Sequence, residues 1–172
     1  MVGKRFDGYR CDEFHFRPAI YQLVGISVDG NVFAIENIIK PTDFFESIED
    51  VGCISVTPIP CLPVQSRVKN GILVDTPVDE VIENIIVIED TETMYCGDTD
   101  LYDFSYTKAL VFVLPTRQIV FEKDVWFSED IFIYKGPNAV EKIMSPESEA
   151  EESDQYSFRI ERKETSLLNS IA

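Results

Sequence analysis

Short apolar runs separated by turn-forming dipeptides recur along this 172-residue chain, and they constrain its fold more than any other feature. The runs at 20–27 and 32–39 flank Asp29-Gly30, a dipeptide that readily adopts the positive φ angles of tight hairpin turns. A second pair of runs, at 106–114 and 118–121, surrounds a proline-containing turn. The pattern predicts a predominantly antiparallel β fold, built as a sandwich or as a curled, barrel-like sheet.

The dipeptide Asn70-Gly71 is the strongest hairpin signal in the sequence. It separates the segments 64–68 and 72–76, which we therefore expect to pair as two strands. Another strand is expected at 85–89, because its first four residues are all β-branched and such side chains favour strands.

Two or three short helices are expected at the edges of the sheets, which makes the fold class α+β. Thr42 predicts the start of a helix at 43–50, because a threonine N-cap is followed there by acidic residues that suit the positive end of the helix dipole. A proline followed by acidic residues predicts a second helix at 77–84. Asn138 is expected to cap a third at 139–144.

Residues 90–103 are polar and rich in Thr and Asp, and they predict a loop. Within it, Asp98 and Asp100 are two residues apart, so their carboxylates could converge on a hard cation such as Ca²⁺ or Mg²⁺. The segment departs from the EF-hand pattern, which requires glycine where this chain has Asp103 and glutamate where it has Ala109. No metal site and no cofactor are therefore predicted.

The composition divides the chain into three parts. Residues 1–145 are expected to form a single strand-rich globular domain, and residues 146–155 an acidic linker with little to bury. Residues 156–172 begin with alternating apolar and polar side chains, and Tyr156, Phe158 and Ile160 form the apolar row. We therefore expect a C-terminal arm that docks by adding a strand to a sheet, either of its own chain or of another subunit.

The chain is strongly acidic, with 31 acids against 15 bases, a formal net charge of −16 and a pI near 4.3. Direct binding to nucleic acid or to an anionic membrane is therefore not expected, because both depend on Lys and Arg. No basic residue occurs between Lys69 and Lys108. The acidic residues of that interval are predicted to bind a basic partner, and they are Asp75, Asp79, Glu80, Glu83, Glu89, Asp90, Glu92, Asp98, Asp100 and Asp103.

No sequence motif marks a catalytic centre. The only histidine, His15, lies between two phenylalanines in a strand-like segment, and no phosphate-binding, serine-hydrolase or zinc-protease pattern occurs. The four cysteines lack metal-binding spacing, so we expect buried free thiols, with a Cys53–Cys61 disulfide as the less favoured alternative. Apolar runs are far shorter than the roughly 20 residues of a membrane span. A cytoplasmic protein, or one within a particle assembled inside the cell, is expected.

Three functions are consistent with these features. The first is a non-catalytic protein–protein interaction subunit of a larger assembly, such as a virion or a similar multi-protein complex, present as an oligomer or hetero-complex. The alternative is a small acidic inhibitor or immunity-type protein that neutralises a basic partner, such as a nuclease or a DNA-binding protein. A metal-assisted hydrolase that uses the loop at 98–103 is the second alternative.

Overall fold

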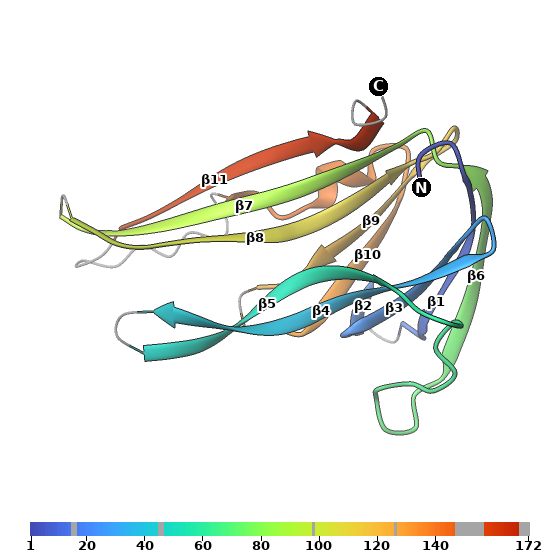
Figure 1. The fold of residues 1–172 in the computed structure, drawn as a ribbon, viewed down its shortest axis with the longest axis horizontal. Helices are drawn as coiled ribbons and strands as arrows, with labels where there is room; N and C mark the ends of the chain where they lie inside the picture. Colours follow the sequence, from blue (N-terminus) through green and yellow to red (C-terminus); the bar gives the residue numbers. More distant parts are fainter. Residues whose placement is uncertain (15–16, 45–46, 98, 126, 147–156, 169–172) are drawn as a thin grey trace.

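The computed structural model describes residues 1–14, 17–44, 47–97, 99–125, 127–146 and 157–168. They form two antiparallel sheets that pack on each other (Figure 1), and only 5% of the chain is helical. The prediction of a mostly antiparallel β fold is confirmed, whereas the two or three short helices are not found. No helix in the described part of the chain is long and apolar enough to cross a membrane.

The first sheet has five strands in the order β5-β4-β3-β1-β6. Its strands are β1 (Arg5–Asp12), β3 (Leu23–Val28), β4 (Asn31–Phe44), β5 (Ser47–Pro58) and β6 (Leu73–Val81). The predicted hairpin around Asp29-Gly30 is confirmed, because these two residues have φ angles of 52° and 76° and join β3 to β4.

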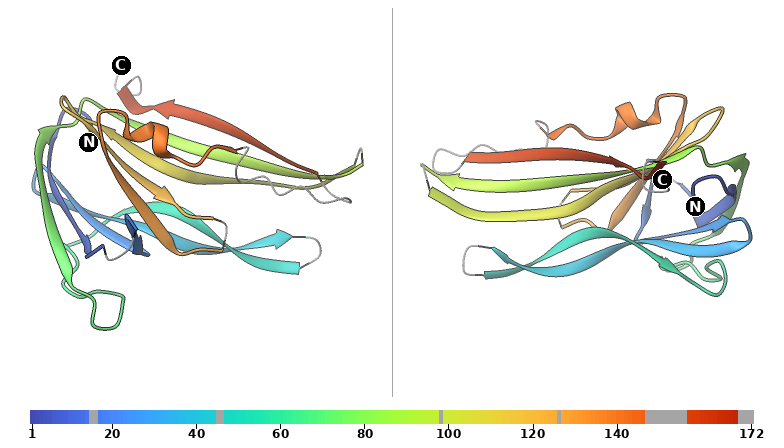
Figure 2. Two further views of the ribbon diagram at one scale, coloured as in Figure 1. Left: turned by 180° about the vertical axis from the view of Figure 1, so that it is seen from behind. Right: turned by 45° about the horizontal axis from the view of Figure 1, so that its top comes forward.

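The second sheet has six strands in the order β11-β7-β8-β9-β10-β2. Its strands are β2 (Ala19–Tyr21), β7 (Asn84–Cys96), β8 (Thr99–Val113), β9 (Gln118–Lys123), β10 (Asp130–Gly136) and β11 (Ser157–Ser166). The second predicted hairpin is confirmed as β8–β9. The β4–β5 and β7–β8 hairpins extend in the same direction from the core in all three views (Figures 1 and 2).

The main core lies between the two sheets. Phe6 of β1 contacts Phe112 of β8 with a ring-centroid distance of 5.0 Å, and Phe112 meets Phe121 of β9 edge-on at 5.8 Å. A smaller apolar cluster covers the other face of the six-stranded sheet, where Val111 and Val120 pack with Ala139 of the 3₁₀ helix η1 (Ala139–Lys142). Figure 2 shows η1 lying against this sheet. The six-stranded sheet is therefore buried on both faces over part of its area.

The helix predicted at 43–50 is wrong, because this segment lies in the β4–β5 hairpin. Pro41 pairs with Asp50 and Thr42 pairs with Glu49 in continuous antiparallel register. A threonine before acidic residues is only a local signal for a helix start, and here pairing between two long strands overrides it.

The helix predicted at 77–84 is also wrong, since β6 covers most of this range. Val78 and Ile82 are both buried, and this spacing of four residues resembles one face of a helix. Between them, Asp79 has a φ of 57° and the β1–β6 register shifts, so a bulge changes the strand periodicity. Pro77 is tolerated because β6 is an edge strand that does not need every backbone N–H.

The loop predicted at 90–103 is wrong, because β7 and β8 continue through most of it as a paired hairpin. Thr91 pairs with Ser105 and Thr93 with Asp103, so the segment is a strand pair that carries these polar side chains on one face. Threonine is β-branched and therefore favours strands. The loop prediction relied on the polarity of the segment and did not weigh this preference.

The Asn70-Gly71 hairpin and the third helix need correction as well. Asn70 has a φ of 62°, as a tight turn requires, but residues 59–72 form a loop because β6 pairs with β1 and not with 64–68. The helix expected at 139–144 is shortened to the 3₁₀ turn η1, and the Asn138 side chain makes no capping hydrogen bond.

The strand expected at the start of the C-terminal arm is present as β11. It pairs with β7 of the same chain in an unbroken register, from Ser157 opposite Tyr95 to Ser166 opposite Ile86. The predicted linker at 146–155 lies outside the described residues except for Pro146, as does Tyr156 of the predicted arm.

Candidate interaction surface

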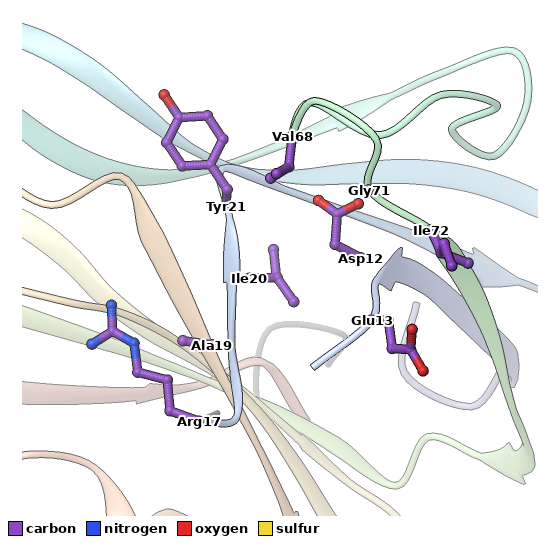
Figure 3. A pocket seen from close by; sticks show the side chains of 9 residues that line it. All are labelled: Asp12, Glu13, Arg17, Ala19, Ile20, Tyr21, Val68, Gly71 and Ile72. Carbon is purple, nitrogen blue, oxygen red and sulfur yellow. The ribbon is translucent and has the colours of Figure 1, made fainter. Parts of the chain in front are cut away.

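A pocket opens where the end of β1, the short strand β2 and the loop 59–72 meet (Figure 3). Its volume is about 260 Å³, and it is lined by Asp12, Glu13, Arg17, Ala19, Ile20, Tyr21, Val68, Gly71 and Ile72. The residues come from three separate stretches of sequence, so the tertiary fold brings them together.

The loop 59–72 is held against the five-stranded sheet. A Cβ atom on Gly25 of β3 would lie only 2.3 Å from Cδ of Pro63, so the absence of a side chain lets the loop approach the strand. Arg10 donates a hydrogen bond to the Pro63 carbonyl at 3.3 Å. Arg67 donates to Gln22 at 3.0 Å and pairs with Glu36 at 2.5 Å. These contacts fix the wall of the pocket before any partner binds.

A compact turn shapes the side of the pocket formed by this loop. Ser66 Oγ donates to the Val68 carbonyl at 3.0 Å and accepts from the Val68 N–H at 2.9 Å. The Gly71 N–H donates to the Val68 carbonyl at 2.9 Å. A Cβ on Gly71 would come within 2.2 Å of Ser66 Oγ and 3.1 Å of Asp12 Oδ1, so a side chain at position 71 would displace Ser66 from this turn.

One wall of the pocket is apolar and largely exposed. Ile20 forms its buried base at 3% exposure, whereas Tyr21, Val68 and Ile72 are 37%, 45% and 62% exposed. Clustered apolar side chains that stay exposed at the rim of a concavity are typical of binding surfaces.

The charge of the pocket is negative. Oδ1 of Asp12 is buried and has no hydrogen-bond partner among the described residues, and Glu13 is exposed at the rim. Arg17 lies on the opposite side in Figure 3 and is already engaged. Its guanidinium pairs with Asp130, lies 3.7 Å from Asp124 and sits 5.1 Å from the centroid of the Phe132 ring.

A second cluster of charged side chains lies in the six-stranded sheet and is buried. Asp90 of β7 forms a two-pronged ion pair with Arg162 of β11, at 2.8 and 2.7 Å. Lys108 and Glu122 are 3.2 Å apart, and both are almost fully buried. Arg162 also donates to the Met144 carbonyl at 3.0 Å, and the Met144 N–H donates to Glu122. This cluster joins β11 and the chain after η1 to the sheet.

The acidic residues predicted to bind a basic partner are divided between the two sheets. On β6, Asp75 pairs with Arg10 at 2.7 Å, Asp79 lies 3.5 Å from Arg5, and Glu80 pairs with Arg117 at 2.8 Å. Glu83 is exposed just after β6.

In the other sheet the predicted acids vary in exposure. Glu89 lies 3.8 Å from Lys163, whereas Asp90 and Glu92 are buried. The Tyr102 hydroxyl donates to Glu92 at 3.2 Å; burial, together with this carboxylate, raises the pKa of Tyr102. Asp103 is exposed on β8. Asp98 and the side chain of Asp100 lie outside the description.

The described residues of the C-terminal arm that were predicted to bind a partner face β7 of their own chain. Phe158 is in register with Met94 and Ile160 with Glu92, and both side chains are half-buried. Binding of another chain by these residues stays a prediction.

Potential metal ligands do not cluster in the part of the chain that the structure describes. No three His, Cys, Asp or Glu residues gather there as metal ligands would, and His15 lies outside the description. All four cysteines are free, so the Cys53–Cys61 disulfide is not formed. Cys11 and Cys53 are buried as expected, whereas Cys61 and Cys96 are exposed. Burial raises the pKa of Cys11 to about 12, which keeps this thiol protonated and unreactive.

Comparison with known proteins gives no match to a family model, to a curated protein or to a solved structure. The site must therefore be interpreted from its own geometry. Sequence reasoning missed the pocket residues, although one signal was available. The segment 58–63 carries three prolines and is followed by isolated apolar residues, a composition typical of an ordered loop that presents side chains to solvent.

Proposed function

We propose that this chain is a non-catalytic interaction subunit that binds another protein through the pocket between β1, β2 and the loop 59–72. The observation that carries the proposal is the apolar wall formed by Tyr21, Val68 and Ile72, which stays exposed around a pocket with firmly anchored walls. A partner that covers these side chains gains hydrophobic free energy, at roughly 25 cal/mol per Å² of apolar surface removed from water.

The anchoring of the loop also favours binding. A flexible loop loses conformational entropy when a partner orders it, whereas a preformed surface avoids most of this cost. Here the loop is held by Arg67, by the contact between Gly25 and Pro63, and by its own turn at Ser66. Tyrosine is one of the residues that dominate binding energy at interfaces, which favours Tyr21 as a contact.

The acidic inhibitor remains the second candidate, and the net charge of −16 favours it. A basic partner would approach such a chain faster than a neutral one. Several of the acids first assigned to this role are paired within the chain, for example Asp75 and Glu80. The metal-assisted hydrolase has no supporting observation among the described residues.

Co-purification with matched variants tests the proposal. Wild type, Ile72→Asp and Val81→Asp are compared as full-length baits in an extract of the source cells. Val81 is the control because it is 50% exposed on β6 but does not line the pocket. We expect a partner that survives a high-salt wash to be retained by wild type and Val81→Asp and reduced at least tenfold by Ile72→Asp. Equal retention by all three, or no retained partner, would refute the proposal.

A further inference from the structure

We propose that the pocket receives the side chain of a lysine or arginine from the partner protein. This inference rests on the proposed function and specifies the chemistry of the residue that enters the pocket. It follows from three properties of the site: a buried carboxylate oxygen without a donor, an apolar wall, and a volume suited to one side chain.

The first property is the state of Asp12. Its Oδ1 is buried and accepts no hydrogen bond among the described residues. A buried acceptor without a donor is costly, by about 1–3 kcal/mol and more when the group is charged. Because Oδ1 is closed to solvent in the free chain, the Asp12 carboxylate must rotate slightly as an ammonium or guanidinium group enters; the cation then supplies both the missing donor and the opposite charge. A cation bound in the pocket would therefore donate the hydrogen bond that Asp12 Oδ1 lacks among the described residues.

The second property is the combination of apolar and acidic surface. Lysine and arginine carry a charged head on a chain of methylene groups, and they bury that chain on apolar surface while the head contacts polar groups. Tyr21, Val68 and Ile72 provide apolar surface at separate points around Asp12 (Figure 3). A purely apolar ligand would leave the carboxylate unpaired, and a purely polar one would leave this wall uncovered.

The third property is size. A volume of about 260 Å³ is below the range of roughly 300–1,000 Å³ that is typical of sites for small organic ligands. It suits one long side chain of a bound protein better than a cofactor or a helix. The backbone of the partner would then lie outside, across the exposed parts of Val68 and Ile72.

The arrangement of charges disfavours an anionic ligand. Arg17 is the one basic side chain among the described residues that line the pocket, and Asp124 and Asp130 already compensate its charge. Glu13 is exposed at the rim beside Asp12, so an anion would meet two carboxylates. Repulsion of this kind selects a cationic side chain over a neutral or negative one of similar size.

NMR titration of the full-length, ¹⁵N-labelled protein tests the inference with three probes. N-acetyl-lysine methylamide and N-acetyl-arginine methylamide carry the two cations, and N-acetyl-norleucine methylamide is the neutral control with a similar apolar chain. We expect at least one cationic probe to shift the amide signals of Asp12, Gly71 and Ile72 saturably, with a dissociation constant in the millimolar range. The norleucine probe should bind at least fivefold more weakly. The ratio between the two cationic probes shows which of the two side chains the pocket prefers.

Two variants test whether the cationic probe binds at Asp12. Asp12→Asn keeps the shape of the side chain and removes its charge, and it should weaken the cationic probe at least fivefold. Asp103→Asn removes the same charge from an exposed position on β8 and should leave binding unchanged. Equal binding of all three probes, no binding of either cation, or an Asp12→Asn variant that binds like wild type would overturn the inference. The proposed function is tested separately. It would be refuted if the Ile72→Asp variant retained the partner as well as wild type does in the co-purification experiment.

Discussion

Gly25 shows at the scale of one residue how the sequence positions the pocket. It lies in β3, and Pro63 and Leu62 of the loop 59–72 occupy the space that a side chain would fill. No turn or positive φ requires glycine here; the requirement is close packing of a loop on a strand.

Replacement of Gly25 by alanine should therefore destabilise the protein. The new Cβ would lie 2.3 Å from Pro63 Cδ and 3.0 Å from Leu62 Cδ2, so the loop must move. Overpacking of this kind costs about 1–3 kcal/mol, measurable by urea denaturation. In a Pro63→Ala background the cost should fall, because the clashing ring atoms are gone. An equal cost in both backgrounds would show that the contact with Pro63 is not responsible.

Asp7 stabilises the β3–β4 turn through its charged form. The Gly30 N–H donates to its carboxylate at 2.9 Å and holds the pKa of Asp7 below its usual range, with further help from Ser27 and Arg5. Because the pKa of Asp7 is lowered in the folded state, its carboxylate stabilises the fold at pH values above its ordinary pKa, which is near 4. That stabilisation is lost as the pH falls through the lowered pKa.

We expect Asp7→Asn to lower the free energy of unfolding by roughly 1 kcal/mol at pH 7, because it removes a charge-assisted hydrogen bond. The difference from wild type should narrow steadily below about pH 4. Urea denaturation at pH 7 and at pH 2.5 measures both values. A difference that stays constant over this range would contradict the role of the charged carboxylate.

At the scale of elements, a buried ion pair reinforces the backbone pairing of β11 with β7. Arg162 binds Asp90 of β7 and, through the Met144 carbonyl, the chain after η1. The other charged pairs of this strand are exposed, such as Arg159 with Glu161. Exposed pairs contribute about 0–1 kcal/mol, whereas removal of one partner from a buried pair costs about 3–5 kcal/mol.

Arg162→Ala should therefore destabilise the protein by about 3 kcal/mol or more and loosen β11 first. Hydrogen exchange should become faster in β11 and in the β7 amides that pair with it. Arg159→Ala is the matched control, because it removes an arginine from the same strand, and it should cost less than about 1 kcal/mol. Similar losses for the two variants would mean that the buried pair does not hold the strand.

Short sequence signals predicted an element correctly where neighbouring residues alone determine its conformation. The Asp29-Gly30 turn was predicted because two residues with positive φ define it by themselves. The helices at 43–50 and 77–84 were wrong because strand pairing and the bulge at Asp79 override capping preferences. Both effects depend on partners far along the chain, and a single sequence does not reveal them.

The candidate site could not be predicted for a related reason. Asp12 and Tyr21 are far from Ile72 in the sequence, and none of the three belongs to a recognisable motif. Even the segment that looked most functional, 75–103, is divided between the edge strand of one sheet and the long hairpin of the other. Counting charged residues along the chain gives the sign of the net charge. It does not show where on the surface a charged side chain lacks a partner of opposite charge.

At the scale of the whole molecule, the net charge of −16 predicts how binding depends on salt. At 0.15 M ionic strength the Debye length is about 8 Å, so distant acids contribute mainly to the rate of approach. We expect the affinity for the partner to fall as salt rises but to persist at 1 M, because the apolar wall is not screened. The Asp12→Asn/Glu13→Gln variant should show a smaller salt dependence in surface plasmon resonance. An affinity unaffected by salt, or abolished by it, would contradict this combination of forces.

Site-specific photo-crosslinking tests the central claim most directly. A benzoylphenylalanine residue replaces Ile72 at the rim of the pocket in one sample and Val81, at the far end of the same sheet edge, in another, and both are irradiated in the source cells. We predict a defined adduct with one partner protein from position 72, absent at position 81, whose crosslinked peptide contains a lysine or arginine near the attachment point. Adducts of equal yield at both positions, or none at position 72, would contradict the claim that this pocket is where the protein binds its partner.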